Sequence, residues 1–194
     1  MENKLKIVFA TGNVHKLQEI NEISKDYDIE FILPPAGFNP VENGKTFMEN
    51  SYIKAKEAAL ISENISLADD SGLCIEALNG EPGLHSARYD ITPEARINKV
   101  LKNMENADNR KAKFVCAMTL VDETGKILTQ EIGECHGKIT QSPSGVNGFG
   151  YDPIFEVDGY GITMADMSED LKNSISHRSI ALCKILIYIK TSLM

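Results

Sequence analysis

Two adjacent aspartates, Asp69 and Asp70, follow a short apolar run at residues 65–68 and precede Ser71 and Gly72. Ionised carboxylates side by side repel each other, so a chain that brings them to the edge of a core needs a countercharge. A divalent cation is one such countercharge, because magnesium usually takes one or two protein carboxylates together with water and phosphate oxygens. The alternative is a solvated acidic turn with Ser71 and Gly72 as its turn residues.

A loop of mostly small residues at 11–16 joins a predicted buried strand to a predicted helix. Backbone N–H groups at the start of a helix have no partner within it and bind anions well. Gly12 allows a ligand to approach the backbone closely, and Lys16 in the first turn can place its ammonium against a phosphate. The alternative is a plain strand-to-helix turn, since the chain lacks the GxxxxGK[ST] pattern of a Walker A loop.

Two further segments carry groups that suit a nucleotide. Glycines flank Phe149 on both sides, so its ring is a candidate platform on which a base stacks; the alternative is an aromatic turn packed in the core. His177 and Arg178 stand at the start of the predicted last helix, where the helix dipole favours acids. An anionic or acceptor-rich ligand would remove this conflict, although a core-facing neutral histidine is the commoner explanation of His177.

The chain has 194 residues, of which 42% are hydrophobic and 25% charged, as in a globular protein with a real core. Its 20 basic and 28 acidic residues give a net charge of −8, which argues against nucleic acid and against an anionic membrane surface as partners. The first residues do not show the pattern of a signal peptide, and no apolar run reaches the length of a membrane span, so a cytoplasmic location is expected. We expect a single domain over residues 1–194.

The elements that must position these groups alternate between helical and extended patterns, which favours an α/β or α+β fold. Strands are predicted at residues 5–10, 29–33, 65–68, 114–121 and 126–136, the last two joined by a hairpin at 122–125. Helices are predicted behind Asn13, from the capping box at Thr46 to about Ile61, behind Thr92 and Pro93, and at the end of the chain. The last helix has apolar residues around most of its circumference, which predicts that it is buried.

Six segments in this order closely resemble the inosine triphosphate pyrophosphatase family, in particular its bacterial dITP/XTP pyrophosphatases. They are residues 9–16, 42–50, 68–73, 78–89, 148–155 and 176–178. One departure is the segment 144–147, where the family more often has Thr-Gly-x-Gly; it concerns fine specificity, because it leaves the charged site residues in place.

The resemblance implies an α/β protein with an elongated two-lobed fold, a long mixed β-sheet flanked by helices, and an active-site cleft between the lobes. It implies hydrolysis of deaminated purine nucleoside triphosphates (dITP, ITP and XTP) to the monophosphate and pyrophosphate, which cleanses the nucleotide pool. It also implies Mg²⁺ as the cofactor and a homodimer.

The resemblance also implies roles for individual residues. Asp70 matches the proton acceptor and, with Glu42, the magnesium ligands. The catalytic positions are matched by Asp70, Asp69, Lys16 and Lys54. The substrate-binding positions are matched by Thr11, Gly12, Asn13, Val14, His15, Lys16, Ser71, Phe149, Gly150, Tyr151, Asp152, Lys172, His177 and Arg178.

These roles suggest that water attacks the α-phosphorus while cationic side chains offset the charge on the leaving pyrophosphate. Asp70 is the first candidate for the general base, with Asp69 or a chain of solvent as alternatives. Donors from His177 or Arg178 would accept a 6-oxo base and oppose the donor of adenine. Two other functions remain open: a purine-nucleotide sensor without hydrolysis, and a magnesium-dependent phosphatase that releases orthophosphate.

Overall fold

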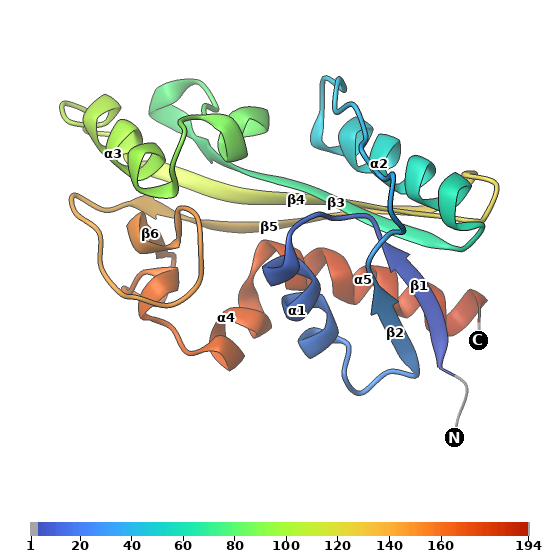
Figure 1. Cartoon of the computed structure of the whole chain (residues 1–194). Helices are drawn as coiled ribbons and strands as arrows, with labels where there is room; N and C mark the ends of the chain where they lie inside the picture. Colours follow the sequence, from blue (N-terminus) through green and yellow to red (C-terminus); the bar gives the residue numbers. More distant parts are fainter. Residues whose placement is uncertain (1–3, 194) are drawn as a thin grey trace. The chain divides into compact units, whose positions relative to one another are not determined.

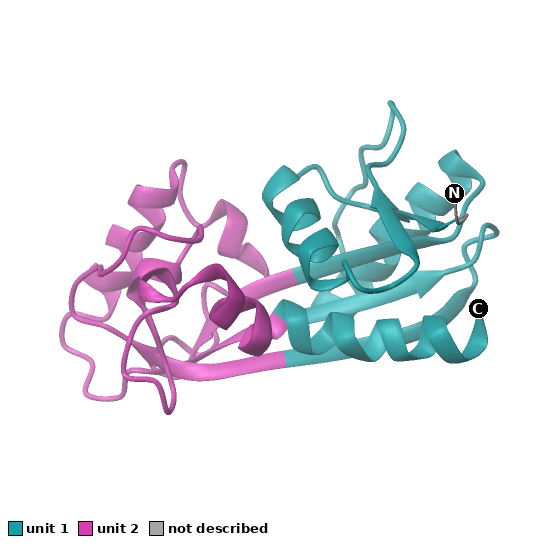
Figure 2. Cartoon of the chain, turned by 90° about the horizontal axis from the view of Figure 1, so that it is seen from below, with its two compact units in different colours: residues 1–70, 116–133, 178–194 teal, residues 71–115, 134–177 magenta. Residues whose placement is uncertain are grey.

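The computed structural model describes residues 4–193 and separates them into two compact units (Figure 2). Unit 1 comprises the described residues of 1–70, 116–133 and 178–194, and unit 2 comprises residues 71–115 and 134–177. The helices are α1 (Val14–Ile23), α2 (Phe47–Ser62), α3 (Pro93–Asn103), α4 (Glu169–Ile175) and α5 (His177–Ser192). The strands are β1 (Leu5–Phe9), β2 (Ile29–Ile32), β3 (Ser66–Ile75), β4 (Lys111–Val121), β5 (Ile127–Ile139) and β6 (Phe155–Val157).

The described strands form one six-stranded sheet in the order β2-β1-β3-β4-β5-β6. Strand β1 runs parallel to both β2 and β3, whereas β5 and β6 are antiparallel. The sheet is therefore mixed, and the predicted α/β class is confirmed. The strands β3, β4 and β5 each contribute residues to both units.

In unit 1, helices cover both faces of the sheet (Figure 1). Ile7 and Phe9 of β1 belong to a buried cluster with residues of α1 and α5, while Val8 of the same strand packs with the alanines of α2. This alternation is the period of a strand. A strand that is buried on both faces reads as a continuous apolar run, which is why β1 was predictable.

In unit 2, one buried cluster joins α3 to the sheet. It contains Val100 and Met104 of α3, Phe114 of β4 and Phe155 of β6, and the partly buried Ile175 of α4 packs against it. Helix α3 begins as predicted, with Thr92 as the N-cap that accepts a hydrogen bond from the N–H of Ala95 and Pro93 in its first turn.

Local signals located most of the other elements. Thr46 caps α2 by accepting from the N–H of Glu49, and the carboxylate of Glu49 reaches back to the N–H of Lys45. The hairpin between β4 and β5 is closed by the hydrogen bond from the N–H of Asp122 to the carbonyl of Lys126. These contacts involve residues at most four apart, so the sequence predicts them directly.

Two predictions about the elements are wrong. The strand expected to end at Ala68 continues as β3 through both aspartates to Ile75, so Ser71 and Gly72 lie in a strand and not in an acidic turn. Helix α5 is buried along one side only: Leu182, Ile185 and Ile189 are fully buried, whereas Ile187 is 61% exposed. The rest of unit 1 therefore covers only part of the apolar surface of α5.

Within residues 4–193, none of the helices has the length and apolar character that a membrane-spanning helix needs.

Candidate active site

The two aspartates of β3 face opposite sides of the sheet, because successive side chains of a strand alternate. Asp69 lies on the side of Leu67, which packs with α1 and α5, and Asp70 lies on the side of Ala68, which packs with α2. Each carboxylate therefore meets its own set of cations. This explains why two adjacent acids can remain within a strand.

Asp69 is 1% exposed and is held by two cations of unit 1. The Nζ of Lys16 in α1 donates to both of its oxygens at 2.9 and 2.8 Å, and the Nη2 of Arg178 in α5 donates to Oδ2 at 3.1 Å. Burial alone would raise the pKa of Asp69, but the charges of Lys16, Arg178 and Lys54 outweigh it and hold the pKa far below its usual range. Asp69 is therefore charged at neutral pH.

Arg178 is fully buried and its guanidinium is divided between two carboxylates. Its Nη1 donates to Oε2 of Glu19 in α1, and its Nη2 and Nε donate to Asp69. Burial opposes its charge, but the attraction of Asp69 and Glu19 raises the pKa of Arg178. The carboxylates of Glu19 and Asp69 thus resolve the conflict between Arg178 and the helix dipole. This arrangement does not favour the prediction that Arg178 offers its donors to the base.

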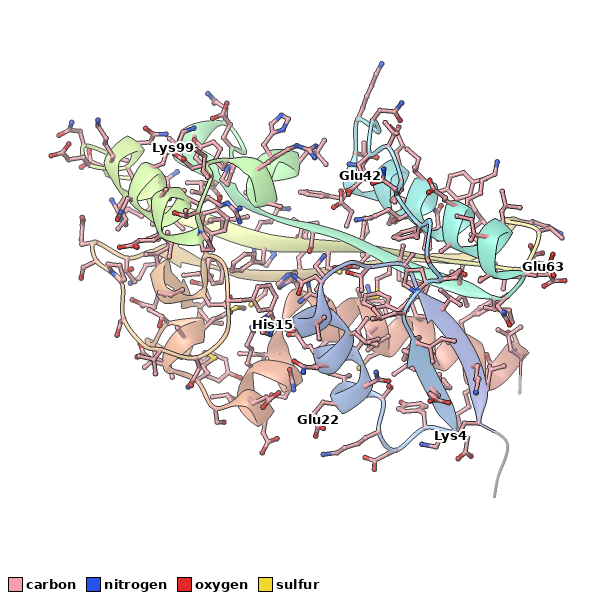
Figure 3. The ribbon with its side chains drawn as sticks, viewed as in Figure 1. Lys4, His15, Glu22, Glu42, Glu63 and Lys99 are labelled. Carbon is pink, nitrogen blue, oxygen red and sulfur yellow. The ribbon has the colours of Figure 1, made fainter. Side chains whose placement is uncertain are left out.

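Asp70 belongs to a second group, which centres on Lys54 of α2. The Nζ of Lys54 lies 3.5 Å from Oδ1 of Asp70 and 3.2 Å from Oε2 of Glu42. Asn50, one helical turn before Lys54, donates from Nδ2 to Oδ2 of Asp70 at 3.0 Å. Glu42 comes from the loop before α2, where Figure 3 labels it.

The electrostatics of this second group differ from those of Asp69. Burial raises the pKa of Asp70, and neighbouring Asp69 and Glu42 add to the rise, so Lys54 and Asn50 do not fully offset it. Burial lowers the pKa of Lys54, but three carboxylates outweigh burial and raise it. Burial is the larger cause of the shift at Asp70, whereas the surrounding carboxylates decide the direction of the shift at Lys54. Four carboxylates face three cations here. The carboxylates are Glu19, Glu42, Asp69 and Asp70, and the cations are Lys16, Lys54 and Arg178.

The predicted phosphate-binding loop opens α1 in unit 1. Asn13 is the N-cap and accepts from the N–H of His15 at 3.0 Å, while its own N–H donates to Oγ1 of Thr11. Gly12, Val14 and His15 are exposed, and a Cβ at Gly12 would meet no atom within 4 Å. The loop thus offers an open backbone surface at the start of α1, where Figure 3 labels His15.

The residues predicted to bind the base gather in unit 2 around the turn at 148–152. Oδ2 of Asp152 accepts from the N–H of Phe149 at 2.8 Å and from Nζ of Lys172 at 2.7 Å. The same Nζ lies 4.7 Å from the ring centroid of Phe149. A Cβ at Gly148 would lie 2.1 Å from Oδ2 of Asp152, so only glycine fits there. One face of the Phe149 ring is therefore taken by Lys172.

The other predicted residues of unit 2 are more buried. Tyr151 is 5% exposed, and its hydroxyl donates to the carbonyl of Ser86 at 2.9 Å. His177 is also buried, and its ring stacks on Phe114 with a centroid distance of 4.8 Å and an interplanar angle of 12°. This is the surrounding of a core-facing histidine. Ser71 is half-buried on β3, next to Asp70 in the sequence.

The structure thus brings the predicted residues together in two groups. Unit 1 holds the 11–16 loop, Glu42, Lys54, Asp69, Asp70 and Arg178, and unit 2 holds Ser71, Phe149 to Asp152, Lys172 and His177. Sequence reasoning missed Glu19 and Asn50. Both stand at helical spacing from a predicted residue, Glu19 three positions after Lys16 and Asn50 four before Lys54, and that spacing was the available signal.

Comparison with known proteins agrees with this geometry. The model of the Ham1 family matches residues 7–188. A dITP/XTP pyrophosphatase of Prochlorococcus marinus (strain NATL1A) is 46% identical over 187 residues, which cover 96% of this chain and 94% of the relative. One of Treponema denticola, also named dITP/XTP pyrophosphatase, is 46% identical over 198 residues, which cover 97% of this chain and all of the relative.

A solved structure shows the same likeness in three dimensions. The HAM1 protein from Coxiella burnetii superposes with a TM-score of 0.88 at 41% sequence identity, and the match covers 97% of this chain and 100% of that one. The family model and both relatives cover nearly the whole chain, and the resemblance predicted from six short segments is confirmed. The chain belongs to the Ham1 family.

Proposed function

We propose that this protein hydrolyses dITP, ITP and XTP to the nucleoside monophosphate and pyrophosphate. The observation that carries the proposal is the division between the two aspartates: Asp69 is paired with Lys16 and Arg178, whereas Asp70 lies with Glu42 around Lys54 on the other face of the sheet. A site for binding alone has no need of an acid placed in that way. The names of the relatives, dITP/XTP pyrophosphatase, supply the substrate class.

The second group suits a divalent cation, for which we propose Mg²⁺ held by Asp70 and Glu42. Among residues 4–193 no set of three His, Cys, Asp or Glu side chains is placed to hold a metal alone. Two carboxylates completed by water and phosphate oxygens are, however, the usual surroundings of Mg²⁺, and the excess of carboxylates over cations calls for positive charge. When bound, the ion supplies neutralisation of phosphate oxygens and orientation of a water molecule.

The residues of unit 1 divide the remaining work. Lys16 and the backbone of the 11–16 loop bind phosphate oxygens, as helix N-termini do, and Lys54 offsets the negative charge that develops on the leaving group. The oxygen of water attacks the α-phosphorus, the bond to the bridging α–β oxygen breaks, and pyrophosphate leaves. In this proposal Asp70 takes the proton of the water as the general base.

Recognition of the base is assigned to unit 2. Because the guanidinium of Arg178 is turned to Glu19 and Asp69, the donor that distinguishes a 6-oxo purine from adenine is assigned in this proposal to Lys172. A donor that meets the amino group of adenine leaves two polar groups unpaired, and such mismatches discriminate strongly.

The decisive assay measures both possible phosphate products. We expect release of pyrophosphate and not orthophosphate from dITP, ITP and XTP, with kcat/KM for ATP lower by about 100-fold or more. Release of orthophosphate would favour the phosphatase, and binding without either product would favour the sensor. Equal turnover of ATP and ITP would contradict the donor argument.

Replacement of Lys172 tests the assignment of the base to unit 2. Lys172→Met removes the ion pair with Asp152 and the cation over Phe149, and we expect KM for ITP to rise about 10-fold with a much smaller change in kcat. Lys138→Met, which removes an exposed pair with Glu156 in the same unit, is the matched control. Steady-state kinetics of both variants decide, and a fall in kcat alone for Lys172→Met would place Lys172 in the chemistry instead.

The homodimer, the cytoplasmic location and the absence of nucleic-acid and membrane partners remain predictions of the sequence and of the resemblance.

A further inference from the structure

Asn50 is a fully buried side chain, 1% exposed, that no role of the predicted active site includes. Its Oδ1 accepts from the N–H of Gly44 at 2.8 Å, and its Nδ2 donates to Oδ2 of Asp70 at 3.0 Å. One amide thus links the loop that carries Glu42 to the strand that carries Asp70. All of these residues belong to unit 1.

The orientation of this amide is fixed by its partners. The N–H of Gly44 can only donate, and an ionised carboxylate can only accept. A flipped amide would place two donors together at Gly44 and two oxygens together at Asp70. The side chain of Asn50 therefore has only one orientation in which both hydrogen bonds form. In this orientation it fixes the distance between the loop at Gly44 and the carboxylate of Asp70.

The approach of the loop to Asn50 depends on the absence of a side chain at position 44. A Cβ on Gly44 would lie 2.7 Å from Oδ1 and 2.9 Å from the backbone N of Asn50. Real Cβ contacts do not reach this range, so any other residue would displace the loop. The φ of Gly44 is not positive, so close approach, and not backbone conformation, is what requires glycine here.

The linked segments carry the two carboxylates that face Lys54. Glu42 stands two residues before Gly44, and the Nζ of Lys54 lies 3.2 Å from Oε2 of Glu42 and 3.5 Å from Oδ1 of Asp70. Oδ1 of Asp70 faces Lys54 while Oδ2 is held by Asn50. Fixing one oxygen of a carboxylate fixes the direction of the other. Residues that hydrogen-bond to metal ligands in this way orient the ligands and alter the affinity for the metal.

We propose that Asn50 is a positioning residue, acting together with Gly44, that sets the separation and direction of the Glu42 and Asp70 carboxylates for a divalent cation. The inference rests on the proposed function for the identity of the two ligands. It adds that metal affinity is controlled by an uncharged residue that touches neither the cation nor the nucleotide.

The test measures binding of Mn²⁺ to the nucleotide-free protein by titration calorimetry. We expect the Kd to rise about 10-fold in Asn50→Ala and to rise also in Gly44→Ala, which leaves Asn50 intact. The double variant should bind Mn²⁺ no more weakly than Asn50→Ala, because two changes that break one linkage are not additive. At saturating metal, KM for dITP should stay within about twofold of the wild type.

Ser51→Ala is the matched control. Ser51 is the next residue of α2 and is equally buried, but it touches neither carboxylate. Its replacement removes hydrogen bonds to Thr119 and to the carbonyl of Met48. Its Kd for Mn²⁺ should equal that of the wild type even if its melting temperature falls.

Three results would overturn the inference: an unchanged Kd in Asn50→Ala, additive effects of the two changes, or no binding of Mn²⁺ to the wild type. If Asn50→Ala does not fold, Gly44→Ala alone decides by the same Kd. Failure of the proposed function gives a different pattern, since a protein that releases no pyrophosphate can still show the shifted Kd for Mn²⁺.

Discussion

Replacing Asp70 by asparagine is expected to lower kcat for dITP by about 10³-fold, within the range for loss of a general base. The change keeps the shape of the side chain and removes the proton acceptor. It also breaks the hydrogen-bonding pattern, because both oxygens of Asp70 receive donors, one from Asn50 and one from Lys54. An amide can present an oxygen to only one of them.

Asp70→Asn should lose little stability, in contrast to its large loss of kcat. Burial raises the pKa of Asp70, so its charged form is less favourable in the folded protein than in the unfolded chain. Such a group stabilises the fold below the unfolded pKa, and this contribution is lost as pH rises through the folded pKa. At neutral pH the charge is a cost, and we expect the free energy of unfolding of Asp70→Asn to stay within about 1 kcal/mol of the wild type.

Asp122→Asn serves as the control, because it should have the opposite effects on stability and on turnover. Asp122 is half-buried and accepts from the N–H groups of Thr124 and Lys126 in the hairpin between β4 and β5. Its loss should lower stability and leave turnover within about twofold. Pyrophosphate release at saturating Mg²⁺ and urea unfolding, measured on both variants, check the pair; a kcat above a tenth of the wild type in Asp70→Asn would remove Asp70 from the chemistry.

The parts of this fold that sequence predicted are those fixed by neighbours in the chain. The caps at Thr46 and Thr92 and the turn at Asp122 use donors at most four residues away. The strand β1 was found because burial on both faces leaves an unbroken apolar run. Residues only a few positions apart in the chain are therefore sufficient to predict such elements.

The length of β3 could not be predicted in this way. Whether the chain turns after Ala68 or continues depends on the cations that meet Asp69, and these are 53 and 109 residues away in the sequence. The acceptors that Arg178 faces could not be predicted for the same reason. A cation at a helix start implies an acceptor, but the sequence does not say whether the acceptor is a ligand or, as in the structure, the side chains of Glu19 and Asp69.

Loss of Arg178 is expected to be the most destabilising single change in unit 1. Arg178→Met keeps much of the volume but leaves the carboxylates of Glu19 and Asp69 buried without their shared cation. Breaking a buried ion pair from one side typically costs about 3–5 kcal/mol. Urea unfolding at pH 7 measures the loss, with Arg110→Met as the control, because Arg110 donates three hydrogen bonds to neutral carbonyls and its removal strands no charge.

A second substitution separates stability from function. In Glu19→Gln/Arg178→Met one of the two stranded charges is neutralised, so part of the lost stability should return, whereas activity should not, because Asp69 still lacks one of its two cations. The pH dependence supplies a further check. In the wild type the pKa of Asp69 is lowered, so its contribution is present above the unfolded value of about 3.9 and is lost as pH falls towards the folded value.

Without Arg178 the pKa of Asp69 moves back towards its usual range, and the loss of stability below about pH 4 should become shallower than in the wild type. Recovery of activity together with stability in the double variant would show that Arg178 serves the fold alone. Recovery of stability alone would show that Arg178 also keeps Asp69 charged and directed at Lys16, so that Lys16 is set in place for the phosphate before the nucleotide binds.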